Sequence, residues 1–130
     1  MARASSEVLG QGQVAFDVLA VPSSLRLLRL GVADRAAGMG LDSEAVERAR
    51  NAVDELAAVL VGAEPGARLH VVVSDDGRRL LLEGEVEHDG PVPELDQIVQ
   101  ELLDLCLGAA GWRIRSGEGR LSFAAVVRAR

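Results

Sequence analysis

Two kinds of hydrophobic spacing alternate along this chain of 130 residues. Between residues 43 and 61, apolar side chains recur at steps of three and four, which places them on one face of an α-helix. That face carries Val46, Ala49, Val53, Leu56 and Leu60. We therefore expect a long amphipathic helix here, with this face against the core.

A shorter helix is expected on each side of the long one. Upstream, Ser23 or Ser24 can cap a helix that follows Pro22 and ends near Gly38 and Gly40. Its inner face would carry Leu25, Leu28, Val32, Ala36 and Met39. Downstream, the same spacing predicts a helix from about Pro93-Glu94 to Gly108. Its inner face would carry Leu95, Ile98, Val99, Leu102 and Cys106.

The remaining segments have the spacing and turns of β-strands. A first strand is expected over residues 14–21, one hairpin over 68–74 and 78–87, and another over 112–116 and 120–128. Asp75-Asp76-Gly77 and Gly117-Glu118-Gly119 are the turn signals. The order strand, helix, helix, hairpin, helix, hairpin predicts an α+β fold, a two-layer sandwich. A mostly antiparallel mixed sheet would be covered on one face by three helices, in a single domain over 14–130 after a flexible tail over 1–13.

Composition excludes several functions. The formal net charge of -6 disfavours a sequence-independent grip on nucleic acid, which needs basic side chains on the phosphates. No apolar run has the length of a membrane span and no signal peptide is visible, so we expect no membrane partner and a cytoplasmic location. Cys106 stands among leucines and suits a buried hydrophobe. With one Cys and the separated His70 and His88, no metal site is expected.

Two groups of charged residues are candidates for function. Asp54 and Glu55 are adjacent acids beside the apolar face of the long helix, and a solvated acidic edge is the simpler explanation for them. Arg26 and Arg29 stand one turn apart on the first helix and form a local basic patch on an acidic protein. Such a patch is either an ordinary solvated face or a partner surface.

The order of elements, together with the segment Ala52-Val53-Asp54-Glu55, resembles the anti-sigma factor kinases of the RsbW and SpoIIAB type. These belong to the histidine-kinase-like ATPases. The resemblance covers residues 14 to 127 and is strongest to the actinobacterial anti-sigma-F branch, which also reads A-V-D-E here. It implies the histidine-kinase-like ATPase fold, a homodimer, and ATP with magnesium as cofactors. It also implies that Glu55 orients or deprotonates an attacking hydroxyl.

The sequence departs from the family at three places that hold the nucleotide. Val59 stands where the family's E-x-x-x-N motif has the magnesium-binding Asn. In the D-x-G-x-G box, Gly90 is kept, but His88 replaces the adenine-reading Asp, for which Asp89 could substitute after a one-residue slip. The glycine-containing lid is absent between Gly90 and the next helix. The nucleotide-binding candidates are therefore Asp54, Glu55, Asp89 and Gly90, in a site that we expect to be degenerate.

The family's first helix bears an arginine that contacts the sigma factor. Counting back from Glu55 places Arg29 at that position, with Arg26 beside it. One hypothesis is an anti-sigma factor that sequesters an alternative sigma factor of the SigF or SigB type and is released by an anti-anti-sigma STAS protein. A second is an active serine kinase that phosphorylates a STAS-domain antagonist. A third is a degenerate member of the fold that binds another partner.

Overall fold

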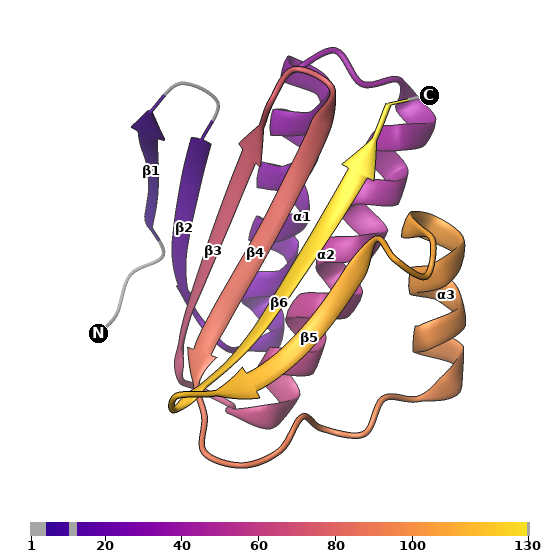
Figure 1. The fold of residues 1–130 in the computed structure, drawn as a ribbon. Helices are drawn as coiled ribbons and strands as arrows, with labels where there is room; N and C mark the ends of the chain where they lie inside the picture. The colour runs from indigo at the N-terminus through magenta and orange to yellow at the C-terminus, as the bar shows by residue number, and fades with distance from the viewer. Residues whose placement is uncertain (1–4, 11–12, 130) are drawn as a thin grey trace.

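The computed structural model describes residues 5–10 and 13–129, which form one sheet and three helices (Figure 1). In chain order the elements are β1 (Ser5–Gly10), β2 (Gln13–Leu19), α1 (Pro22–Gly38), α2 (Ser43–Ala63), β3 (Arg68–Asp75), β4 (Arg79–Glu87), α3 (Gln97–Leu107), β5 (Trp112–Gly117) and β6 (Arg120–Arg128). Over the described residues, no helix is both long and apolar enough to cross a lipid bilayer.

The sheet is a single six-stranded layer with the order β1-β2-β3-β4-β6-β5. Each described strand pair is antiparallel, so the expected mixed character is absent from this part of the chain. All three helices lie on one face, with α1 and α2 behind β2 to β6 and α3 beside α2 at the β5 edge (Figure 1). The predicted α+β two-layer sandwich is confirmed.

Helix α2 is the centre of the helical layer. Its N-cap residue Asp42 accepts a hydrogen bond from the amide of Ala45 at 2.8 Å, which satisfies one of the free donors of the first turn. The predicted apolar face is buried as expected at Ala49, Val53, Leu56 and Leu60, each with no exposed surface. Val46, the fifth member, is half-buried. This face fixes which side chains of α2 can reach its two neighbours.

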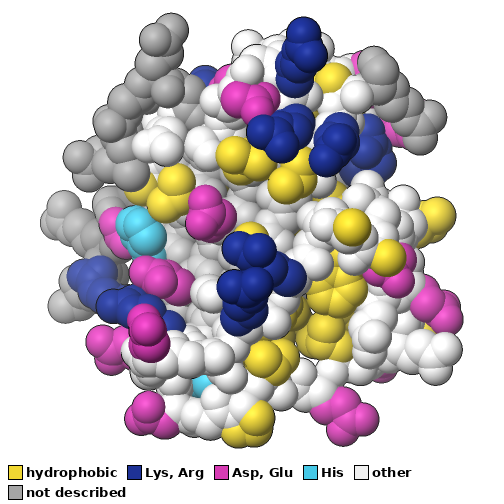
Figure 2. Space-filling view, viewed as in Figure 1, with side chains coloured by type: hydrophobic (Ala, Val, Ile, Leu, Met, Phe, Trp, Pro, Cys, Tyr) yellow, Lys and Arg dark blue, Asp and Glu magenta, His cyan; other side chains and the backbone are white. Residues whose placement is uncertain are grey.

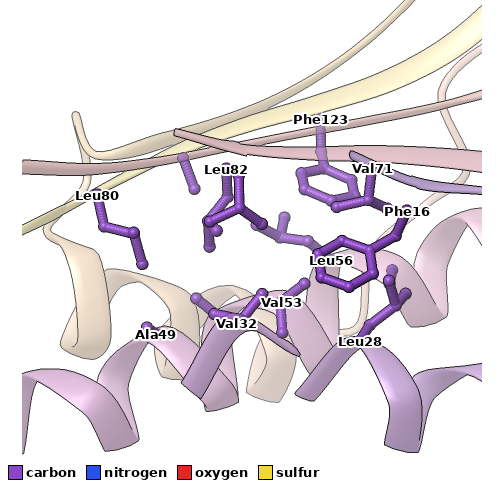
Figure 3. Packing of buried hydrophobic residues seen from close by; sticks show 14 of the residues in the cluster. Phe16, Leu28, Val32, Ala49, Val53, Leu56, Val71, Leu80, Leu82 and Phe123 are labelled. Atoms are coloured by element: carbon purple, nitrogen blue, oxygen red, sulfur yellow. The ribbon is translucent and has the colours of Figure 1, made fainter. Parts of the chain in front are cut away.

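Two phenylalanines fill the space between the layers (Figure 3). Phe16 on β2 and Phe123 on β6 both point toward the helices and are nearly buried. Gly31 on α1 lies against the ring of Phe16, and Gly84 on β4 lies against the ring of Phe123. A Cβ atom at either glycine would overlap the ring. Gly31 therefore allows α1 to approach the sheet closely, and Gly84 leaves room on β4 for the ring of its cross-strand neighbour Phe123.

The N-terminal region differs from the expected tail. Ser5–Gly10 form β1, which pairs with β2 and extends the sheet by one strand. The expected tail covers residues 1–13, of which residues 1–4 and 11–12 lie outside the described residues. Edge pairing uses backbone groups and needs little side-chain alternation, so the short segment SSEVLG gave no strand pattern in the sequence. The following strand, expected over 14–21, is Gln13–Leu19, because the helix already begins at Pro22.

Helix α3 begins later than expected, and its buried face is rotated away from the expected one, so that Cys106 is buried as expected and Ile98 is not. It starts at Gln97 because the side chain of Asp96 accepts a hydrogen bond from the amide of Ile98 at 2.8 Å. Leu103 and Cys106 are buried, whereas Ile98, expected on the inner side, is 74% exposed. Apolar residues cover more of this helix than α2 and the sheet can contact. Burial raises the pKa of the Cys106 thiol, in keeping with the buried hydrophobe expected there.

Candidate functional site

The two adjacent acids of α2 face different neighbours, Asp54 toward α1 and Glu55 toward α3. Successive residues of an α-helix are about 100° apart, so neighbours in sequence face different neighbours in space. Asp54 Oδ1 accepts a hydrogen bond from Arg29 Nη1 at 2.6 Å and is therefore directed toward α1. Glu55 lines a groove on the α3 side. Glu55 thus lines this groove and Asp54 does not, and the nucleotide-binding roles of both residues stay predictions.

The groove lies between α2 and the segment that leads into α3, and we call it the α2–α3 groove. Its volume is about 340 Å³. Its lining is Glu55, Ala58, Val59, Gly62 and Ala63 from α2, and Pro93, Glu94, Leu95, Asp96 and Val99 from the other side. The walls are mostly aliphatic, three carboxylates belong to the lining, and no Lys or Arg does. Such a lining suits an apolar group with positive charge better than a polyphosphate, which needs cationic or amide donors.

Glu55 is the titratable group of α2 in this groove. Burial raises the pKa of its carboxyl, and the negative charge of the neighbouring Asp54 raises it further. A carboxylate with a raised pKa is a better proton acceptor near neutral pH than an ordinary one. Within the groove, Glu55 is therefore the residue whose chemistry matches a general base.

The residues around Glu55 do not fit magnesium. Val59 lies one turn further along α2 and lines the same groove, where it presents methyl groups and no lone pair. Among the described residues, no group of three His, Cys, Asp or Glu side chains is placed to hold a metal ion. At Val59 the groove thus offers no ligand for the magnesium ion that would carry the phosphates of ATP.

His88 does not line the α2–α3 groove but links the end of α2 to the turn before α3. Its Nδ1 lies 2.7 Å from Glu64 Oε2, at the end of α2, and its Nε2 donates to the carbonyl oxygen of Pro91 at 3.0 Å. The hydrogen bond to the Pro91 carbonyl raises the pKa of the His88 imidazole, and the hydrogen bond that His88 donates to the Glu64 carboxylate adds to this effect. The side chain is 11% exposed. His88 therefore fixes the turn before α3 to the end of α2.

The other nucleotide-binding candidates lie apart from Glu55. Asp89 lines a separate hollow of about 450 Å³, shared with His88, Glu118 and Arg120 among others. Gly90 lines neither hollow and has a φ of 126°, a conformation that favours glycine. The structure does not bring Asp89 and Gly90 together with Glu55, and their roles in nucleotide binding stay predictions.

The N-terminal half of α1 presents a surface that we call the α1 face: Arg26, Leu27, Arg29 and Leu30. Arg26 is exposed, and Leu27 and Leu30 are 39% and 56% exposed. Arg29 is held at the edge of this face by its ion pair with Asp54. Residues 22–31 contain no acid. Sequence reasoning identified the two arginines but missed the leucines, although the run RLLRL already carries more apolar residues than one buried face can hold.

Sequence reasoning also missed a polar pair on the uncovered face of the sheet, the face toward the viewer in Figure 2. Asp17 and His70 stand directly opposite each other on β2 and β3, and His70 Nδ1 lies 2.5 Å from Asp17 Oδ1. Strand alternation could have placed both residues outward. The register that joins them depends on a pairing across 53 residues, which no local pattern reveals.

Comparison with known proteins gives a fold and no sequence family. No protein-family model matches the chain, and no curated protein matches it. Among solved structures, the chain resembles the crystal structure of the RsbU and RsbW domains of Rv1364c from Mycobacterium tuberculosis, with a TM-score of 0.64 and 15% sequence identity. The match covers 88% of this chain and 32% of that chain, so this chain spans about a third of its length. The part matched is the RsbW domain, and this chain has the RsbW-like ATPase fold.

Proposed function

We propose that this protein is an anti-sigma factor that sequesters an alternative sigma factor of the SigF or SigB type. An anti-anti-sigma STAS protein would counter it, and it would act as a cytoplasmic homodimer. The observation that carries the proposal is the RsbW-like fold, which extends over 88% of the chain. Residues 14 to 127, over which the sequence resembles the anti-sigma factor kinases, include all of that fold except β1 and the ends of β2 and β6.

The α1 face supplies a suitable partner surface. Arg26 offers an exposed guanidinium group of the kind that binds a carboxylate in two-pronged fashion, and Leu30 offers exposed apolar area. Arg29 lies at the edge of this surface in its ion pair with Asp54. Arginine next to apolar anchors is the composition found at the centres of protein interfaces. An acidic, partly apolar surface of the sigma factor would complement it.

Sequestration requires no chemistry, which agrees with the composition of the α2–α3 groove. The groove lacks a magnesium ligand at Val59, has no cationic side chain in its lining, and does not include Asp89. A protein that acts by binding alone can lose these contacts and keep its function.

Calorimetric titration with the purified SigF-type or SigB-type sigma factors of the source organism tests the proposal. We expect one of them to bind, and Arg26→Glu to weaken that complex. Arg113→Glu, an exposed arginine on β5, is the matched control and should leave binding unchanged. Absence of binding to every such sigma factor would end the proposal, and equal binding by Arg26→Glu would remove the α1 face from it.

A serine kinase is the second candidate, and the raised pKa of Glu55 in the groove favours it. In that case the carboxylate would accept the proton of a serine hydroxyl on the STAS antagonist while ATP supplies the phosphoryl group. Incubation with labelled ATP, magnesium and the STAS protein separates the two functions. Phosphate transfer that disappears in Glu55→Gln would establish the kinase, whereas sigma-factor binding without transfer supports sequestration.

A further inference from the structure

The most exposed large hydrophobic side chains of the described residues lie together on α3. Leu105 is 83% exposed and Ile98 is 74% exposed, ahead of Leu30 on α1 at 56%. They are seven residues apart, which places them on the same side of the helix, and the half-buried Leu102 lies between them. We call this stripe of Ile98, Leu102 and Leu105 the α3 face. It is a linear apolar surface two turns long.

The α3 face begins next to the α2–α3 groove. Leu95 and Val99, which line the groove, precede and follow Ile98 along the chain. On the opposite wall, α2 contributes the small residues Ala58, Gly62 and Ala63, which leave room for another backbone to approach. An apolar stripe on a helix beside an apolar groove is the arrangement that helix-in-groove recognition uses.

The charge around this surface has one sign. Residues 93–107 contain Glu94, Asp96, Glu101 and Asp104 and no Lys, Arg or His. Asp96 caps α3 and Asp104 accepts a hydrogen bond from Trp112 Nε1 at 2.8 Å, while Glu94 and Glu101 are exposed. At the α3 edge in Figure 2, apolar and acidic side chains are visible and basic ones are not.

The basic residue of α2 on the α3 side is Arg48, and its guanidinium group is bound away from the groove. Arg48, whose charge acts on Cys106 near the end of α3, donates through Nη2 to the carbonyl oxygen of Arg128 at 3.0 Å. Glu55 adds a further carboxylate to the groove. An occupant must therefore bring its own positive charge.

We propose that the α2–α3 groove and the α3 face bind a basic amphipathic helix of a partner protein. The helix would lay its apolar side on Ile98, Leu102 and Leu105, and its Lys or Arg residues would face Glu94, Glu101 and Glu55. A second copy that presents the same surface is disfavoured, because two acidic faces repel each other. The proposal uses the opposite side of α2 from the α1 face and does not rest on sigma-factor binding.

The probe is a designed peptide of about 15 residues, the length at which an isolated helix becomes marginally stable. It has leucines at helical spacing and lysines at the remaining positions, and a peptide with glutamates in place of the lysines is the control. The protein is the full chain, alone and as the double variant Ile98→Lys/Leu105→Lys. The matched control is Leu30→Lys on α1, which also replaces an exposed apolar side chain by lysine but lies outside the proposed site. Fluorescence anisotropy gives the affinity, and amide chemical-shift changes give the location.

We expect the lysine peptide to bind, the glutamate peptide not to bind, and affinity to fall as salt is raised. The double variant should bind about a hundredfold more weakly, since each of its two lost apolar anchors contributes on the order of a tenfold change. Leu30→Lys should bind as the parent does, and shift changes should fall on residues of α2 and α3.

Three results would overturn the proposal. One is equal binding of the lysine and glutamate peptides, and another is unchanged affinity in the double variant when its unfolding curve shows an intact fold. The third is self-association: if sedimentation velocity shows a dimer of the parent that becomes a monomer in Ile98→Lys/Leu105→Lys, the occupant is a second copy of this chain.

Discussion

The α1 face and the α3 face lie on either side of α2 and differ in charge although both expose leucine. The α1 face has Arg26 and Arg29, and the segment that carries it has no acid. The α3 face stands in a segment with four acids and no base. One helical layer thus carries two exposed apolar surfaces in segments of opposite charge, and on our two proposals each would bind a different kind of partner.

Helix α2 keeps the two surfaces electrostatically separate. Asp54 neutralises Arg29 on one side, and Glu55 adds negative charge to the groove on the other. A two-acid site would have required both carboxylates on one side. The helical repeat instead assigns one acid to each neighbour of α2.

The largest expected effect comes from the scaffold that both surfaces share. Leu56→Ala removes a side chain with no exposed surface from the centre of α2 and leaves a cavity between the helices and the sheet. We expect the free energy of unfolding to fall by about 2–5 kcal/mol. Urea unfolding measures it, with Asn51→Ala on the exposed side of α2 as the control. The helices that carry the α1 face and the α3 face both pack on α2, so this loss of stability should affect both. If Leu56→Ala unfolded at the same urea concentration as the parent, the core of α2 would not support the two surfaces.

The scaffold was predictable because burial follows spacing over long segments. The apolar face of α2 and both hairpins follow from spacing and turn residues alone. The outer surfaces were harder: Ile98 was expected inside, since spacing identifies an apolar stripe but not how much of it neighbours can cover. The helical repeat sets Asp54 about 100° from Glu55, but the partner of Asp54 is Arg29, 25 residues away, and no local pattern reveals that pairing.

The second prediction breaks the α1 face without touching the α3 face. On the proposed function, Arg29→Glu places like charges opposite each other in the complex and also leaves Asp54 without its partner. We expect sigma-factor binding to weaken by about 2 kcal/mol, or roughly thirtyfold. Glu101→Lys, an exposed charge reversal on α3, should leave that affinity unchanged. Comparable losses in both variants would mean that the two surfaces act as one interface.

The third prediction concerns the turn that forms one wall of the α2–α3 groove. His88 binds Glu64 and the Pro91 carbonyl, and these contacts raise its pKa above the ordinary value of 6.5. A histidine whose pKa is raised in the folded state contributes stability that is fully present below its unfolded-state pKa. That stability is lost as pH rises through its folded-state pKa. The difference in unfolding free energy between the parent and His88→Asn should therefore be largest under acidic conditions and shrink with rising pH.

Urea unfolding across a pH series measures that difference. Arg26→Ala on the α1 face is the control, and its effect should not vary over the same range. A difference that grows with pH would show that His88 is bound as the neutral ring and that the turn is held in another way.

The smallest expected effect tests whether the groove can be returned to a nucleotide site by one residue. Val59→Asn supplies an amide oxygen one turn from Glu55, where magnesium could bind. The lining still has no cationic side chain, Asp89 still belongs to another hollow, and the segment from Pro91 to Pro93 cannot fold over a triphosphate. At ATP concentrations up to the dissociation constant, bound ligand stabilises a protein by less than about 0.4 kcal/mol. We expect magnesium and millimolar ATP to raise the stability of Val59→Asn, measured by thermal unfolding, by no more than that amount. A larger, magnesium-dependent shift would show that the other contacts are dispensable and that Val59 alone keeps ATP out of the groove.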